Sequence, residues 1–162
     1  MVRGVQIKPL LVSVGILAGI AAVVTLAAQA TTQQDGVIYW SDGDSGRLPD
    51  GTRFRLHGVD APETGSLLQR GGAECEAERE IGYLAKEAAV ELTRGKTITI
   101  TRDYGPDRYK RLVVDLAIDG EDLAGRLIAA GTHKVWDYDG GAPKPDWCAR
   151  PAQPGNGDPL TP

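Results

Sequence analysis

The stretch from Gly46 to Glu63 constrains the fold of this chain more than any other part of it. Leu48–Gly51 has the composition of a turn, and Thr52–Val59 then alternates apolar with charged side chains. A period of two is typical of a strand with one buried face, so residues 46–59 are predicted to form a β-hairpin. Arg55 lies on the polar face of its second strand.

Carboxylates follow the end of this strand. Pro62 fixes its own φ angle and favours an extended backbone at Ala61, so Asp60 and Glu63 are expected on a defined turn. A hard cation prefers carboxylate and carbonyl oxygens as ligands. Asp44, Asp60 and the carbonyl of Ala61 are therefore candidate metal ligands, and the pattern indicates a metal-assisted phosphodiester site.

Five segments resemble the staphylococcal-nuclease-like (thermonuclease) family, in its order and at close to its spacing. They are Asp42–Ser45, Arg55–Glu63, Asp107–Leu112, Asp119–Leu123 and Leu127–Gly131. A lone Asp-Ala-Pro-Glu motif would be weak evidence, but the ordered set is specific because it includes a second arginine, Arg111, on its own segment. The resemblance covers roughly residues 36–138.

The resemblance implies an α+β fold, namely a five-stranded OB-fold-like β-barrel with packed helices. The apolar patterns agree, because they predict further strands at 37–40, 96–101, 111–118 and 133–136 and a short helix at 123–130. A longer helix is predicted at 73–94, with a buried face formed by Ala77, Ile81, Leu84, Ala88 and Leu92. Residues 64–72 are expected to form a loop, and residues 102–109 a turn-rich connection.

The resemblance also implies roles for single side chains. Arg55 and Arg111 are expected to flank the scissile phosphate, where a guanidinium group stabilises developing negative charge. Glu63 is expected to deprotonate or only to orient the attacking water, and the sequence leaves both roles open. Substrate binding is expected from three further residues, Arg108, Tyr109 and Tyr138. Ordinary surface packing is an equally good explanation for Arg108 or Tyr109 taken alone, and Tyr138 lies close to, but not at, the position of a base-stacking family tyrosine.

The two histidines receive no catalytic role. His57 shares the strand face of Arg55 and is expected to be structural, and His133 is expected at the surface. The three tryptophans are expected to pack rather than to stack on bases.

The activity implied is that of a Ca²⁺-dependent nuclease, a hydrolase that cuts DNA and RNA with low sequence specificity and leaves 3′-phosphate products. Single-stranded or open regions would be preferred, and the protein is expected to be a monomer. The alternatives are a non-catalytic barrel that binds nucleic acid or protein at the cell envelope, and a structural spacer on a membrane anchor. The presence of Arg55, Glu63 and Arg111 favours the enzyme over the binding module.

The charge of the chain argues against an architectural DNA-binding protein. Residues 1–30 contain Arg3 and Lys8 but no acidic residue, so the net charge of −4 becomes −6 without them. Proteins that coat duplex DNA are normally basic. An acidic enzyme can still act on a polyanion where a local pocket is cationic.

The N-terminal residues indicate export. Residues 10–28 form a nearly unbroken apolar run, and Ala28-Gln29-Ala30 has the small-x-small form of a signal-peptidase site. The run is also long enough to span a bilayer. Cleavage after Ala30 would give a periplasmic or secreted protein, whereas an uncleaved signal-anchor would hold the domain outside the cytoplasm.

Both ends of the domain are expected to be irregular. Residues 31–35 are predicted to be a linker before the nuclease domain at 36–138, and residues 139–162 are a proline- and glycine-rich tail. The tail stands where family members carry a long C-terminal helix. Cys75 and Cys148 are consistent with one disulfide in an oxidising compartment, although two unpaired thiols are the alternative. Such a bridge, worth about 4 kcal/mol by chain-entropy estimates, would pin Trp147 against the domain in place of that helix.

Overall fold

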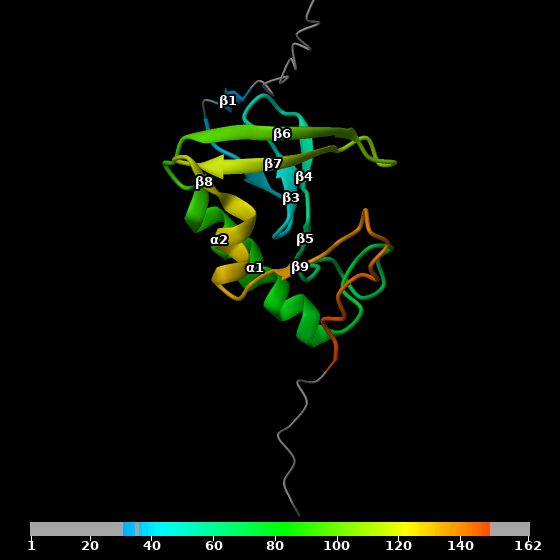
Figure 1. Cartoon of the computed structure of the whole chain (residues 1–162). Helices are drawn as coiled ribbons and strands as arrows, with labels where there is room; N and C mark the ends of the chain where they lie inside the picture. The colour runs from blue at the N-terminus through cyan, green and yellow to red at the C-terminus, as the bar shows by residue number, and fades with distance from the viewer. Residues whose placement is uncertain (1–30, 35, 150–162) are drawn as a thin grey trace, which may run out of the picture.

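A computed structural model describes residues 31–34 and 36–149 (Figure 1). One mixed sheet runs in the order β1-β6-β7-β4-β3-β2, with β8 pairing the free part of β7. Its strands are β1 (Thr32–Gln34), β2 (Tyr39–Trp40), β3 (Ser45–Arg47), β4 (Arg53–Leu56), β6 (Ile98–Pro106), β7 (Leu112–Ile118) and β8 (Glu121–Asp122). The remaining elements are the separate pair β5 (Val59–Asp60) and β9 (Lys134–Val135) and the helices α1 (Glu76–Thr93) and α2 (Leu123–Ala129).

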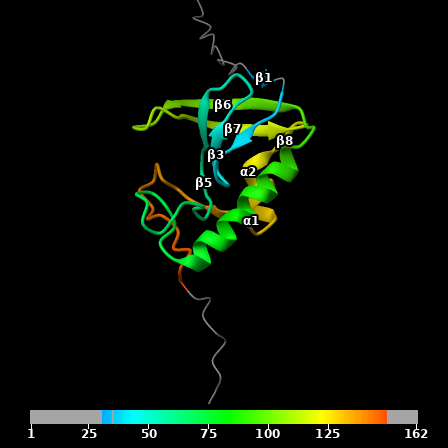
Figure 2. The same cartoon turned by 180° about the vertical axis from the view of Figure 1, so that it is seen from behind.

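The predicted α+β, OB-fold-like architecture is confirmed. The sheet curls into a half-barrel, and both helices lie on the same side of it (Figures 1 and 2). Apolar side chains from the sheet and the helices fill the space between them, and the Trp40 and Phe54 rings meet edge to face at 5.2 Å. Burial of this surface is the main driving force for folding.

The predicted hairpin forms from β3 and β4, with Ser45 opposite Arg55. Phe54 and Leu56 are buried and the intervening Arg55 is only half-buried, as the alternation predicted. The other edge of β4 pairs in parallel with β7, which places Arg55 opposite Val113. This parallel pairing brings the 107–112 segment beside the hairpin, although the two are far apart in sequence.

The predicted buried face of α1 is wrong at Ile81 and Leu84, whereas Leu92 packs against the core as predicted. Leu84 is 60 % exposed and Ile81 is 38 % exposed, whereas the face turned to the domain consists of Glu78, Gly82, Ala85, Ala89 and Thr93. A Cβ atom on Gly82 would lie 2.5 Å from the carbonyl oxygen of Glu63. Glycine at this position therefore allows the helix to approach the Glu63 turn closely.

Two segments expected to be irregular are strands. Residues 32–34, predicted as linker, form β1 and pair with β6, because an edge strand needs only backbone hydrogen bonds and its side chains carry no apolar pattern. The 102–109 connection is also shorter than predicted, since β6 continues to Pro106. Register shifts after Ile100 and after Asp103 let the strand continue past Gly105.

The C-terminal tail of the described chain is irregular and lies against the start of α1. After β9, residues 139–149 contain no helix or strand, and this tail runs beside the 61–75 loop at the start of α1 (Figures 1 and 2). The predicted signal segment at 1–30 and the tail beyond Ala149 lie outside the described residues. Within residues 31–34 and 36–149, no helix is long and apolar enough to cross a membrane.

Candidate active site

Arg55 holds two acidic side chains together at the centre of the site. Its Nη1 donates to Asp44 Oδ1 at 3.1 Å and its Nη2 to Asp60 Oδ1 at 3.3 Å. A further bond from Nη2 reaches the Val59 carbonyl (3.3 Å), and the guanidinium lies over the Trp136 ring at 5.1 Å from its centroid. The planar guanidinium group is thus fixed by partners on several sides, as bidentate recognition of an anion requires.

Local hydrogen bonds hold the 42–45 loop in shape and against β4. Asp42 Oδ1 accepts bonds from the backbone N–H and the hydroxyl of Ser45 at 2.8 and 2.9 Å. The backbone N–H of Leu56 donates to the carbonyl of Asp44 at 2.8 Å. Because the loop is tied to the strand that carries Arg55, Asp44 is delivered directly to the guanidinium.

His133 secures the same loop from the opposite side, and its expected surface position is wrong. The imidazole is buried, and its Nε2–H donates to the carbonyl of Gly43 at 2.7 Å. Burial lowers the pKa of His133, and its Nδ1 lies 2.9 Å from the Thr132 hydroxyl oxygen. A Cβ atom on Gly43 would lie 2.7 Å from that of Ala61, so glycine is required here. No pattern in the sequence predicts this contact, which joins residues 90 positions apart.

Burial dominates the electrostatics of the acidic pair. Asp44 is 4 % exposed and Asp60 is 0 % exposed. Burial raises the pKa of Asp44 well above its ordinary value and repulsion from Asp42 and Asp60 adds to this effect, while Arg55 opposes it. Burial alone would lower the pKa of Arg55, but Asp44 and Asp60 together raise it, so the guanidinium stays charged.

Glu63 is placed by α1 and contacted by the tail. Its backbone N–H donates to Oε1 of Glu78, a buried helix residue, at 3.2 Å. Its carboxylate accepts a bond from Lys144 Nζ at 2.8 Å. Burial raises the pKa of Glu63 above its ordinary value although Lys144 opposes the shift, which brings this carboxylate closer to the range of a general base.

Arg111 lies in the turn that precedes β7. Asp107 Oδ2 accepts bonds from Nε and Nη2 of Arg111 at 2.9 and 2.8 Å, and these contacts outweigh burial to lower the pKa of Asp107. The guanidinium groups of Arg108 and Arg111 lie 4.8 and 5.4 Å from the centroid of the exposed Tyr109 ring. Lys110 adopts φ 60°, a conformation that glycine accepts without steric cost.

A cleft of about 900 Å³ brings the separate segments together. Seven predicted site residues line it: Arg55, Asp60, Glu63, Arg108, Tyr109, Arg111 and Tyr138. The carboxylate of Asp44 and the backbone of Ala61 are buried behind this lining, where the Ala61 N–H donates to Asp44 Oδ2 at 3.1 Å. Arg55, Arg111 and Glu63 thus line one cleft that is large enough for part of a polymer.

Trp136 and Tyr138 form an aromatic part of the cleft lining. Tyr138 is exposed and packs edge to face on Trp136, with 5.2 Å between their centroids.

His57 stacks on Tyr104 at 3.8 Å, and its Nε2 lies 3.0 Å from Asp139 Oδ2. These partners are consistent with the structural role expected for His57.

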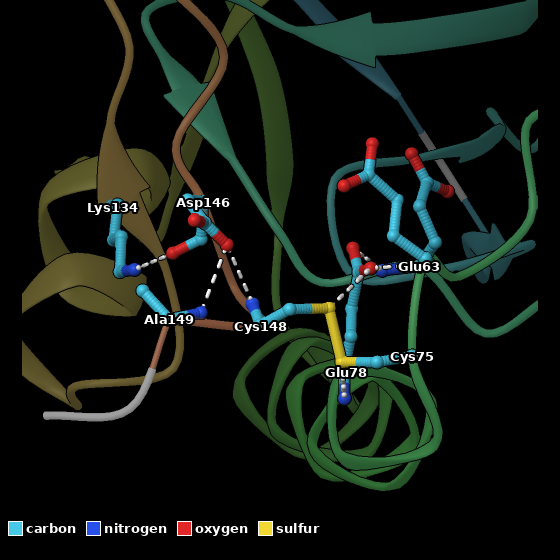
Figure 3. The surroundings of a disulfide bond; sticks show 8 residues. Glu63, Cys75, Glu78, Lys134, Asp146, Cys148 and Ala149 are labelled. Carbon is cyan, nitrogen blue, oxygen red and sulfur yellow. Dashed lines mark hydrogen bonds between the residues drawn. A yellow bond between two sulfur atoms is a disulfide. The ribbon is translucent and has the colours of Figure 1, made fainter.

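The tail closes one end of the cleft. Cys75 and Cys148 form the predicted disulfide, with their Cα atoms 6.0 Å apart, and the bond joins the start of α1 to the tail (Figure 3). Trp147 Nε1 donates to Asp60 Oδ2 at 2.7 Å. Trp147 therefore also contacts a carboxylate of the site. The sequence predicted that Trp147 packs against the domain, but it did not predict this hydrogen bond.

The donor set suits calcium in its chemistry. Asp44, Asp60 and the Ala61 carbonyl offer only oxygen, and two buried carboxylates that repel one another favour a bound cation. No three histidine, cysteine or acidic side chains in the described part of the chain are grouped to share one metal ion. Water or substrate oxygens would therefore have to complete the coordination of calcium.

Comparison with known proteins agrees with this geometry. The family model described as staphylococcal nuclease homologue matches residues 53–146, which is more than half of the chain. The matched range contains the hairpin strand of Arg55, the Glu63 turn, the Arg111 segment and Lys144. No curated protein matches the chain.

Proposed function

The chain belongs to the staphylococcal nuclease homologue family, and from this premise we propose that it is an exported, calcium-dependent nuclease. Its substrates are DNA and RNA, cut with low sequence specificity. The observation that carries the proposal is the convergence of Arg55, Glu63 and Arg111 on one cleft, from three segments that are separate in sequence. Binding alone does not require a half-buried carboxylate in the same cleft as two arginines, whereas the proposed hydrolysis uses all three groups.

Each of the three groups has a distinct task in the reaction. Glu63 orients or deprotonates the water that attacks phosphorus, and its raised pKa suits proton transfer. Arg55 and Arg111 donate to the phosphoryl oxygens as negative charge grows on them. Attack in line with the 5′ oxygen expels that oxygen and leaves a 3′-phosphate.

Calcium bound by Asp44, Asp60 and the Ala61 carbonyl would supply positive charge beside the scissile phosphate. The Arg55 guanidinium, which now spans the two carboxylates, would then be released from part of its pairing and could turn toward the substrate. Asp44 must be ionised to serve as a ligand, so calcium competes with the proton that the raised pKa of Asp44 favours.

The lining of the cleft supports low sequence specificity. Arg108 and Arg111 offer charge to a phosphate backbone, and the exposed rings of Tyr109 and Tyr138 can stack on unpaired bases. Stacking on aromatic rings tolerates every base, and it requires that the base be free of a duplex. Single-stranded or open regions are therefore the preferred substrates of a monomeric enzyme.

The proposed location of the protein is supported by the disulfide and by the sequence before the domain. A Cys75–Cys148 bond persists in an oxidising compartment, which supports export. The chain is then periplasmic or secreted if it is cleaved after Ala30, or membrane-anchored through residues 10–28. Sequencing of the mature N-terminus distinguishes the two forms.

Digestion assays test the proposal. The full chain, kept soluble in a nonionic detergent, is incubated with single-stranded DNA, duplex DNA and RNA, first with calcium and then with excess chelator. Calcium-dependent hydrolysis, fastest on single strands, is expected, with phosphate on the 3′ ends of the products. Digestion that persists undiminished in chelator would refute the metal assignment.

A further inference from the structure

The tail places two groups on the carboxylates of the candidate metal site. Lys144 Nζ lies 2.8 Å from Glu63 Oε1 and 3.8 Å from Asp60 Oδ1. Trp147 Nε1 bonds the other oxygen of Asp60 at 2.7 Å. Together with Arg55, these contacts engage both oxygens of a carboxylate that has no exposed surface.

These contacts depend on a short, well-anchored segment. The disulfide fixes Cys148 to the start of α1, and Figure 3 shows the bond beside Glu78 and Glu63. Asp146 Oδ1 accepts the backbone N–H groups of Cys148 and Ala149 at 2.8 and 2.9 Å. Lys134 on β9 donates to the Asp146 carbonyl at 2.8 Å and also lies over the Trp147 ring at 4.0 Å.

The charge balance of the site depends on this segment. With Lys144 in place, the carboxylates of Asp44, Asp60 and Glu63 face two cations. Without Lys144, the ion pairs of Asp44 and Asp60 with Arg55 would remain, and Glu63 would lose its ion-pair partner. A divalent ion that approaches Asp60 must therefore displace the ammonium group or bind beside it, and either event weakens its binding.

We propose that Lys144 is a tethered counter-cation, which pairs with Glu63, opposes calcium binding at the neighbouring Asp60 and is held in place by the Cys75–Cys148 bond. This inference rests on the proposed calcium site. It assigns to the tail a role in setting calcium affinity, in addition to its role in stabilising the domain.

Calorimetric titration of calcium chloride tests the inference without any activity assay. The full chain in nonionic detergent is compared with Lys144→Gln and with Lys96→Gln, a control that also removes one cation. Lys96 pairs with Asp119 at 2.8 Å, outside the cleft. Lys144→Gln is expected to bind calcium about three- to tenfold more tightly, and Lys96→Gln to match the wild type. The difference should shrink as ionic strength rises, because salt screens the repulsion.

The tether is tested by combining variants. Cys75→Ser/Cys148→Ser should shift calcium affinity toward that of Lys144→Gln, and adding Lys144→Gln to it should change little further. Should the untethered variant fail to fold, Lys144→Gln alone decides the role of the cation.

The outcomes separate this inference from the proposed function. Equal calcium affinity in wild type and Lys144→Gln overturns the counter-cation role and leaves the calcium-dependent nuclease intact. Absence of calcium binding in both overturns the calcium dependence and this inference with it. Wild-type affinity in the untethered variant, with tighter binding in Lys144→Gln, overturns the role of the disulfide.

Discussion

The buried Glu78 carboxylate fixes the backbone of Glu63, accepting its N–H at 3.2 Å. The second oxygen of Glu78 accepts the N–H of Glu74 at 2.7 Å, so one side chain ties both ends of the loop between them. The disulfide lies against the same group, with Cys148 Sγ 3.9 Å from Oε2 (Figure 3). The position of the candidate catalytic carboxylate is therefore set from α1.

Replacement of this acceptor should misplace Glu63. In Glu78→Gln, the amide oxygen can still accept one of the two backbone N–H groups, but the NH2 group faces the other, which loses its acceptor. Turnover is expected to fall about tenfold or more with little change in KM, because the substrate contacts of the arginines remain. Glu80→Gln, on the exposed side of α1, is the control and should behave as the wild type. Steady-state kinetics of the two variants decide the matter, and equal turnover would remove Glu78 from any positioning role.

Arg111 should act on the transition state rather than on the fold. Its side chain lies in the cleft lining and packs on Tyr109, so Arg111→Ala should lower turnover by about 10²-fold, with only a modest fall in melting temperature from the lost pair with Asp107. Arg126→Ala removes an exposed cation paired with Glu121 and serves as the control. Near-wild-type turnover in Arg111→Ala would show that the 107–112 segment carries no catalytic group.

The pKa of Asp44 predicts a pH dependence of stability in the absence of metal. Because its folded-state pKa is raised, the folded protein holds this proton more tightly than the unfolded chain does. The resulting stability is present at acid pH and is lost as pH rises through the raised pKa. Melting temperatures of wild type and Asp44→Asn are compared in chelator between about pH 4 and about pH 8, the range above the ordinary pKa of aspartate. The wild type should lose stability relative to the variant as pH rises.

The comparison with Asp44→Asn isolates this carboxylate from opposing groups. Asp107, whose pKa is lowered by its bonds with Arg111, contributes stability that is lost on acidification, but it does so in both proteins. A difference in melting temperature that stays constant or reverses its slope would contradict the dominance of burial at Asp44.

The disulfide should stabilise the domain. Cys75→Ser/Cys148→Ser frees the tail and enlarges the conformational space of the unfolded chain, so it should melt at least about 5 °C lower than the wild type. Wild-type protein treated with reductant should melt like the variant. Mass spectrometry of protein taken from the cell envelope should find no free thiol, and two free thiols there, or equal melting with and without reductant, would count against the bridge.

Local patterns in the sequence predicted much of the fold. The alternation around Phe54 and Leu56 located β4, because that signal depends only on neighbouring residues. The face of α1 was missed for a physical reason. Its contact with the Glu63 turn selects small volume at Gly82, and a search for apolar residues at helical spacing does not detect that requirement.

The site was predictable in its parts but not in its connections. Arg55, Asp60 and Glu63 lie within nine residues, so the motif and the hairpin placed them together. The bond from His133 to Gly43 spans ninety residues, and neither segment carries a pattern that names its partner. The cysteines predicted that the tail is tied down, but the contacts of Lys144 and Trp147 depend on the path of a segment without periodicity.

The rate at which Glu63→Gln hydrolyses a single-stranded oligonucleotide in calcium, relative to wild type prepared identically, tests the central claim most directly. Glutamine retains the shape and the backbone bond to Glu78 but cannot take a proton, so a loss of about 10²-fold or more is predicted, with both proteins melting as folded domains. Equal rates in the two proteins, or no hydrolysis by the wild type, would contradict the assignment of this cleft as a nuclease active site.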